Sequence, residues 1–221
     1  MKNLQEKTAI IIGATGLVGS HILQLLLSDE RYSKVLVFHR RSTGVSHPKL
    51  TEHIINFDAI EDWKELLVGN ELYSALGTTI KQAGSQEAQW TIDYDYQFEV
   101  AKAAAQIGVE SYALVSSIGA TAETGNFYLK MKGQLDEEVQ ELGFKKTLIV
   151  RPSFLKGERI ESRFLEKIGI TAAELFTKIP GLKKYKPIHA KQVAQALING
   201  LNDSDSKTMY EGDEVFGLSG K

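Results

Sequence analysis

The chain has 221 residues, 43% of them hydrophobic, which suits one domain with a full core. Its 26 basic and 28 acidic residues nearly balance, so no overall charge would attract nucleic acid or an anionic membrane. It has no cysteine, which excludes disulfides and thiolate metal sites and favours a reducing compartment. We therefore expect a cytoplasmic protein.

A glycine-rich turn follows the first expected strand. The apolar run Thr8–Ile12 has strand length, and Leu17–Leu27 has helical spacing. Although the whole stretch is apolar, polar and glycine residues interrupt it and no suitable cleavage site follows. We therefore expect neither a membrane span nor a signal peptide.

The glycines of this turn stand at positions 13, 16 and 19. They could simply connect a strand to a helix. In a nucleotide clamp, Gly13 would permit the tight turn, Gly16 would let the backbone approach a pyrophosphate, and Gly19 would let the helix pack on the sheet. The G-x-x-G-x-x-G spacing resembles that of the short-chain dehydrogenase/reductase superfamily. The expected cofactor contacts are Gly13, Ala14, Thr15, Gly16, Leu17, Val18 and Gly19.

The end of the second expected strand, residues 34–38, indicates which dinucleotide fits. NAD enzymes commonly place an acid about 20 residues past the glycines, whereas an arginine nearby accommodates the 2′-phosphate of NADP. Here His39 is followed by Arg40 and Arg41, with no carboxylate. This favours NADP(H) over NAD(H), the alternative being two arginines on a solvated loop. We interpret His39 as a loop residue.

Strand-like and helix-like segments alternate further along the chain. Because the strand-like runs are apolar on both faces, they predict an α/β fold, a Rossmann-type doubly wound parallel sheet with helices on both faces. We expect residues 1–221 to form a single NAD(P)-binding domain. The later expected strands are 53–56, 71–76, 112–115 and 147–150, and the later expected helices are 60–67, 94–106 and 128–142.

Ser116 and Ser117 end the strand at 112–115, and Tyr128 and Lys132 follow on one face of the next helix. In short-chain dehydrogenases, which this pattern resembles, Tyr-x-x-x-Lys and an upstream serine form the active site. A phenol, with a pKa of about 10, needs nearby positive charge to act as an acid–base at neutral pH. Adjacent strand residues point to opposite faces, so only one serine can face the site, and the sequence does not say which.

Several longer phrases resemble the Tat-interacting-protein-like branch of the atypical short-chain dehydrogenases. They are "SALGTTIKQAGSQE", "TIDYDYQFEVAKAAAQIGVESYALVSSIGA", "NFYLKMKGQLDEEVQELGF" and "RPSFLKGERIESR". The resemblance implies cofactor contacts at Leu76, Gly77, Thr78, Pro152 and Ser153. It also puts Asp58 near the adenine, where an ordinary helix N-cap is the alternative.

The C-terminal region, residues 154–221, is expected to include a small helical lid or substrate region. Helices are expected at 172–178 and 189–201 and a short strand at 208–210. His189 is interpreted as structural. The histidines have no paired spacing that would suit a metal, so no metal site is expected.

Two functions fit these residues. The first is an NADP(H)-dependent reductase of a small carbonyl compound, in which Tyr128 donates the proton and Lys132 also binds the nicotinamide ribose. The second is an NADP(H)-binding redox sensor with little catalysis. Retention of both Tyr128 and Lys132 favours the enzyme. The expected partners are a small-molecule substrate and a second copy of the chain or a regulatory protein, not nucleic acid or a membrane.

Overall fold

The computed structural model describes residues 6–156 and 183–220, and a parallel sheet lies at its centre. Within these residues seven strands lie in the order β3-β2-β1-β4-β5-β6-β9, and all neighbouring pairs are parallel. The order in which successive strands are added to the sheet reverses between β1 and β4. This is the topological switch point, where doubly wound folds bind ligands. The strands are β1 (Lys7–Ile12), β2 (Tyr32–His39), β3 (Leu50–Ile54), β4 (Glu71–Ser74), β5 (Ser111–Val115), β6 (Lys146–Arg151) and β9 (Met209–Glu211).

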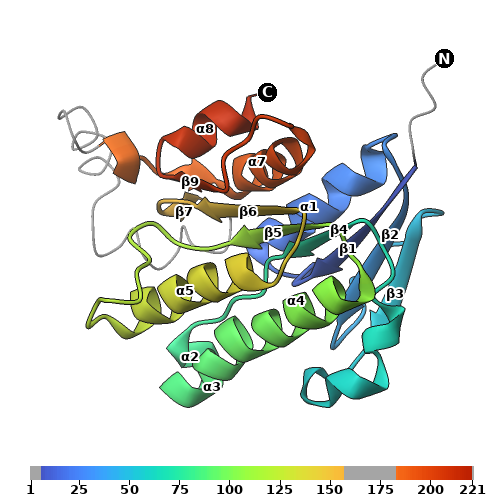
Figure 1. Ribbon diagram of the computed structural model, residues 1–221, viewed down its shortest axis with the longest axis horizontal. Helices are drawn as coiled ribbons and strands as arrows, with labels where there is room; N and C mark the ends of the chain where they lie inside the picture. Colours follow the sequence, from blue (N-terminus) through green and yellow to red (C-terminus); the bar gives the residue numbers. More distant parts are fainter. Residues whose placement is uncertain (1–5, 157–182, 221) are drawn as a thin grey trace.

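Helices cover both faces of the sheet, as Figure 1 shows. On one face lie α1 (Leu17–Ser28), α7 (Ala190–Asn202) and α8 (Glu214–Ser219). On the other lie α4 (Tyr96–Ile107) and α5 (Phe127–Glu138). The predicted α/β fold with helices on both faces is confirmed.

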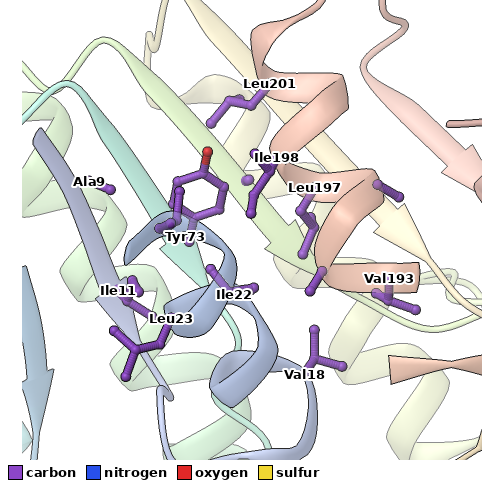
Figure 2. Packing of buried hydrophobic residues seen from close by; sticks show 14 of the residues in the cluster. Ala9, Ile11, Val18, Ile22, Leu23, Tyr73, Val193, Leu197, Ile198 and Leu201 are labelled. Carbon is purple, nitrogen blue, oxygen red and sulfur yellow. The ribbon is translucent and has the colours of Figure 1, made fainter. Parts of the chain in front are cut away.

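Alternate strand residues point into two separate cores. Ala9 and Ile11 of β1 pack under α1 and α7, whereas Ile10 and Ile12 pack under α4 and α5, and all four are fully buried. Figure 2 shows the first core, where Ile22 of α1 lies among side chains of α7. This two-sided burial explains why the strands read as continuous apolar runs.

The predicted helix at 60–67 is wrong in type. The segment forms two short 3₁₀ helices, η1 (Phe57–Asp62) and η2 (Lys64–Leu66), and Ala59 has non-helical dihedrals of −122° and 54°. The Trp63 side chain is buried between them, and its indole N–H donates to the Asn56 carbonyl at 2.8 Å. Burial of the indole ring therefore outweighs the helical periodicity of this segment.

Short elements link β4 to α4 and β6 to α7. A π-helical turn, η3 (Thr91–Asp95), leads directly into α4, which therefore starts slightly later than predicted. A small parallel pair joins the stretch after β6 to the stretch before α7. The remaining short elements are α2 (Ile80–Ala83), α3 (Gln86–Trp90), η4 (Val139–Glu141), β7 (Leu155–Lys156), η5 (Lys183–Tyr185) and β8 (Ile188–His189).

The described part of the C-terminal region belongs to the body of the fold. Helix α7 matches the helix predicted at 189–201 and packs on α1, and β9 matches the strand predicted at 208–210 and pairs with β6. The helix predicted at 172–178 lies outside the described residues.

Candidate functional site

The glycine loop connects β1 to α1 at the carboxyl edge of the sheet. Gly13 has φ +84°, and a Cβ there would lie 2.4 Å from the Ala75 carbonyl carbon. A Cβ at Gly19 would lie 2.0 Å from the Gly13 carbonyl oxygen. Gly13 and Gly19 are therefore required by the turn and by helix packing, whereas a Cβ at Gly16 would lie 3.2 Å from the Gly13 oxygen and is less constrained.

Helix α1 begins in a way that suits an anion. Gly16 is its N-cap, no side chain caps it, and its first turn carries no acid. The leading N–H groups of such a helix can bind phosphate. Thr15 is exposed, whereas Ala14 and Val18 are buried and Leu17 packs against the core, so these last three can offer a ligand only their backbone.

A pocket lies beside the glycine loop where β1, β2 and β4 end. The two exposed arginines, Arg40 and Arg41, line it. Among the described residues that form its wall there is no carboxylate. The lining residues are Gly13, Thr15, Phe38, His39, Arg40, Arg41, Phe57 and Leu76. The pocket thus joins a backbone suited to a dinucleotide with fixed positive charge suited to a phosphate monoester.

His39 differs from its interpretation as a loop residue. It is the last residue of β2, is 5% exposed, and forms part of the pocket wall. The preceding apolar run predicts the strand, but nothing in the sequence shows that the strand continues far enough to bury this imidazole.

Asp58 lies in η1, next to the pocket residue Phe57. Its carboxylate accepts a hydrogen bond from the Tyr96 hydroxyl at 2.5 Å, and the Tyr96 ring stacks on Phe57. Burial and this hydrogen bond raise the pKa of Tyr96 to about 12, while Arg40 opposes the rise. Asp58 therefore holds Tyr96, which packs on the pocket residue Phe57. The Asp58 backbone N–H donates to the Asn56 side chain, which is the N-cap of η1.

The loop after β4 runs along the same edge. Leu76 lines the pocket, and the space around a Cβ on Gly77 is open to 4 Å. The Thr78 N–H donates to the Asp93 carboxylate at 2.7 Å, so the turn η3 holds this loop. Asp93 is 1% exposed and was not predicted to have a role; an acid on the buried face of a helical segment was the available signal.

The two candidate serines point in different directions. The Ser116 hydroxyl is buried and donates to Asp136 at 2.8 Å. Ser117 is half-buried, and its hydroxyl lies 3.5 Å from the Ile118 carbonyl oxygen, at the outer limit of a hydrogen bond. Ser117 is thus the serine whose hydroxyl is free enough to reach a ligand.

Tyr128 and Lys132 lie in the first half of α5, where Asn126 caps the helix by accepting from the Leu129 N–H. Tyr128 is 37% exposed, whereas Lys132 is 3% exposed. Burial raises the pKa of Asp93 and of Asp136, and the Lys132 charge opposes the rise in both. The buried ammonium therefore lies near two buried carboxyl groups from different elements.

Asp136 links this group to the neighbouring strands. It is fully buried, accepts from Arg151 Nε at 2.7 Å as well as from Ser116, and leaves Oδ1 without a hydrogen-bond partner in the described chain. Arg151 also lies 3.5 Å from Glu211. Neither Asp136 nor Arg151 was predicted from the sequence, because their contacts join a helix to strands distant in the chain.

Gly133 lies under the loop that follows β5. A Cβ on this helical glycine would lie 2.2 Å from the Thr121 backbone carbonyl carbon. The Thr121 N–H also donates to the Leu129 carbonyl at 3.2 Å. Gly133 therefore lets this loop cross α5 directly after Lys132.

Pro152 and Ser153 follow β6 and are both buried. The Pro152 carbonyl accepts from the Ile118 N–H at 3.0 Å, which ties the loops after β5 and β6 together. The Ser153 hydroxyl donates to the Lys186 carbonyl, so it is used within the protein. His189 precedes α7, and its backbone N–H donates to the Gln192 side chain.

Comparison with known proteins identifies the family. Residues 13–204 match the family of NAD(P)H-binding domains. The chain belongs to this family. "Protein FMP52-1, mitochondrial" of Scheffersomyces stipitis is 37% identical over 213 residues, covering 94% of this chain and 92% of that one. "Protein FMP52, mitochondrial" of Coccidioides immitis is 36% identical over 208 residues, covering 87% and 84%.

A solved structure shares the fold of this NAD(P)H-binding protein. It is a short-chain dehydrogenase/reductase superfamily protein from Agrobacterium tumefaciens with bound NAD, with a TM-score of 0.66 at 12% identity, covering 95% of this chain and 81% of that one. The predicted resemblance to short-chain dehydrogenases is confirmed at the level of the NAD(P)H-binding family and of this shared fold. Both FMP52 relatives are named mitochondrial, so the expected cytoplasmic location is wrong. A lack of cysteine bears on disulfides and does not identify the compartment.

Within 6–156 and 183–220, no helix has both the length and the apolar character needed to cross a bilayer. The same residues contain no cluster of three or more His, Asp or Glu side chains arranged for a metal ion.

Proposed function

We propose that this NAD(P)H-binding protein is an NADP(H)-dependent oxidoreductase that reduces a small carbonyl compound. The observation that carries the proposal is that one edge of the sheet holds both an arginine-lined pocket beside the glycine loop and a buried Lys132 four residues after the exposed Tyr128. The names of the relatives support a mitochondrial location.

The residues of the pocket fit the dinucleotide. Arg40 and Arg41 would hold the 2′-phosphate, since guanidinium groups pair well with phosphate oxygens. The backbone from Gly13 to Gly19 would hold the pyrophosphate at the start of α1. Leu76, Gly77 and Thr78 would lie along the ribose. When bound, the reduced cofactor supplies a hydride to the carbonyl carbon.

Protein groups would complete the reaction at the carbonyl oxygen. The Tyr128 hydroxyl would donate its proton to that oxygen, and the Ser117 hydroxyl would donate a hydrogen bond to it. The Lys132 ammonium would stabilise the phenolate that remains and bind the nicotinamide ribose. Asp93 and Asp136 support this role, because a buried ammonium needs opposite charge nearby.

Titration with both dinucleotides tests the cofactor assignment. We expect NADPH to bind at least about tenfold more tightly than NADH, and the Arg40→Gln/Arg41→Gln double variant to lose most of that difference while NADH affinity stays constant. A Lys102→Gln/Lys145→Gln variant removes the same charge from exposed sites outside the pocket. Equal affinities of the unaltered protein for NADPH and NADH would refute the assignment.

A panel of small aldehydes and ketones, followed through NADPH absorbance, tests the activity. Turnover of any compound supports the reductase. The redox sensor is the second candidate, and it is favoured by the bond from Ser116 to Asp136, which withdraws one of the two serines from a substrate. Tight NADPH binding with no turnover across the panel would support the sensor.

A further inference from the structure

His39 is a buried polar side chain in the wall of the arginine pocket. It is 5% exposed, and within the described residues neither of its ring nitrogens has a hydrogen-bond partner. Leaving a buried polar atom unpaired is costly, so an unpaired group beside a pocket indicates a partner that arrives from outside.

The charges around this imidazole come from two places. From β3, Glu52 Oε1 lies 3.5 Å from His39 Nε2, and His53 acts on the ring electrostatically. From the chain directly after β2 come Arg40 and Arg41. The pocket residues contributed by the glycine loop, by η1 and by the loop after β4 are uncharged.

Glu52 is fixed in place by the segment that follows the arginines. Its carboxylate accepts hydrogen bonds from the Ser42 hydroxyl at 2.7 Å and from the Thr43 N–H at 2.8 Å. These bonds hold the pKa of Glu52 below its ordinary value against the effect of burial, so it stays ionised at neutral pH. The ionised Glu52 carboxylate therefore lies beside His39 Nε2, where it would stabilise a protonated imidazole.

In the free protein the imidazole is neutral at pH 7. Burial lowers the pKa of His39 below its ordinary value, and the charge of Glu52 only partly opposes this. A dianionic phosphate placed in the same pocket would add a strong attraction for a proton, because opposite charge favours the ionised form.

We propose that His39 is a specificity-determining residue of this pocket: it takes up a proton from solvent when a phosphate monoester binds beside Arg40 and Arg41, and the imidazolium donates a hydrogen bond to that phosphate. The inference rests on the proposed function, in which the monoester is the 2′-phosphate of NADP(H). The phosphate remains a dianion, and the ring gains one N–H.

The direction of the pH dependence follows from linkage. Phosphate binding raises the pKa of His39, so NADP⁺ affinity increases as pH falls through the bound-state pKa and levels off below the free-state pKa. NAD⁺ lacks the monoester, so its affinity gains nothing from this proton. The preference for NADP⁺ should therefore widen on acidification.

The test compares binding of NADP⁺ and NAD⁺ at pH 6.0 and pH 8.5, with proton uptake measured by calorimetry in buffers of different ionisation enthalpy. We expect His39→Asn to bind NADP⁺ about tenfold more weakly than the unaltered protein at pH 6.0 and equally at pH 8.5. Protonation of the free phosphate is common to both proteins and cancels. His21→Asn is the matched control, because this imidazole lies in α1, is not among the residues that line the pocket and is not among the groups that act on the His39 ring, and the variant should keep the preference.

Two further measurements do not depend on the folding of that variant. In the unaltered protein, NMR titration of the His39 ring should show its pKa rising with NADP⁺ and unchanged with NAD⁺. Glu52→Gln should shift the rise in NADP⁺ affinity to lower pH, since Glu52 favours the charged ring. The same pH dependence in His39→Asn as in the unaltered protein, or a ring unaffected by NADP⁺, would overturn the role of His39 and leave the arginine assignment standing. Failure of the arginine assignment would appear instead as equal NADPH and NADH affinities.

Discussion

Two buried polar clusters lie at opposite edges of the same sheet. At the amino edge, Glu71 accepts hydrogen bonds from Lys7 at 2.6 Å, from Tyr32 at 2.6 Å and from Tyr73 at 2.7 Å. Asn202 donates to the Tyr32 hydroxyl at 2.8 Å. At the carboxyl edge lie the cluster of Lys132, Asp93, Asp136 and Arg151 and, beside it, the pocket of His39.

The clusters differ in how fully their atoms are paired. Among described residues, every buried side-chain polar atom of the Glu71 cluster has a partner, whereas Asp136 Oδ1 and both nitrogens of His39 lack one. A satisfied network rigidifies the fold, and unpaired buried groups indicate functional sites. We therefore expect changes at the amino edge to act on stability and changes at the carboxyl edge to act on binding and turnover.

The largest expected effect is at Tyr128. Tyr128→Phe should lower the turnover of a reduced carbonyl compound by roughly 100- to 10,000-fold, because it removes the proton donor, while NADPH affinity changes little. Tyr185→Phe removes a hydroxyl of similar exposure, 40% against 37%, from η5 rather than from α5 and should keep full turnover. Unchanged turnover in Tyr128→Phe would remove the phenol from the mechanism.

The serine pair allows a sharper comparison within the carboxyl edge. Ser116→Ala leaves Asp136 short of a donor and should lower the free energy of unfolding by about 1–3 kcal/mol. Ser117→Ala should leave stability almost unchanged and reduce kcat. Denaturant unfolding and steady-state kinetics on both variants show which serine supports stability and which supports turnover. A loss of kcat in Ser116→Ala and a loss of stability in Ser117→Ala would show that Ser116 is the substrate-facing residue.

The smallest expected effect on function is at the amino edge. Burial raises the pKa of Tyr73 well above its ordinary value, so the hydroxyl stays protonated and donates to Glu71. Tyr73→Phe should lower the free energy of unfolding by about 1–2 kcal/mol, measured in urea, with NADPH affinity and turnover of the folded protein unchanged. A loss of cofactor affinity at constant stability would break the distinction between the two edges.

Most of the fold was predictable because its signals are local. Apolar runs of strand length and the glycine spacing of the first turn predicted β1, α1 and the parallel sheet. Gly13 and Gly19 behave as predicted because backbone atoms lie so close to them that a Cβ at either position would clash. The 3₁₀ segments at 57–66 were missed, since burial of Trp63 overrides helical periodicity there.

The site was predictable only in part. Short motifs predicted Arg40, Arg41, Tyr128 and Lys132, and the structure brings these residues to one sheet edge. Asp93 and Asp136 were not predicted, because their importance comes from contacts with Lys132, Thr78 and Ser116 across three elements. A glycine inside a helix, at position 133, indicates that another group packs closely against the helix there. Only the fold shows that this group is the loop at Thr121.

A crystal structure with NADP⁺ bound would show where both ends of the cofactor lie relative to the arginines and to α5. We expect the 2′-phosphate to lie on Arg40 and Arg41 and the nicotinamide ring to lie beside the Tyr128 hydroxyl and the Lys132 ammonium. A bound nicotinamide elsewhere, with the Tyr128 hydroxyl directed into bulk solvent, would contradict it.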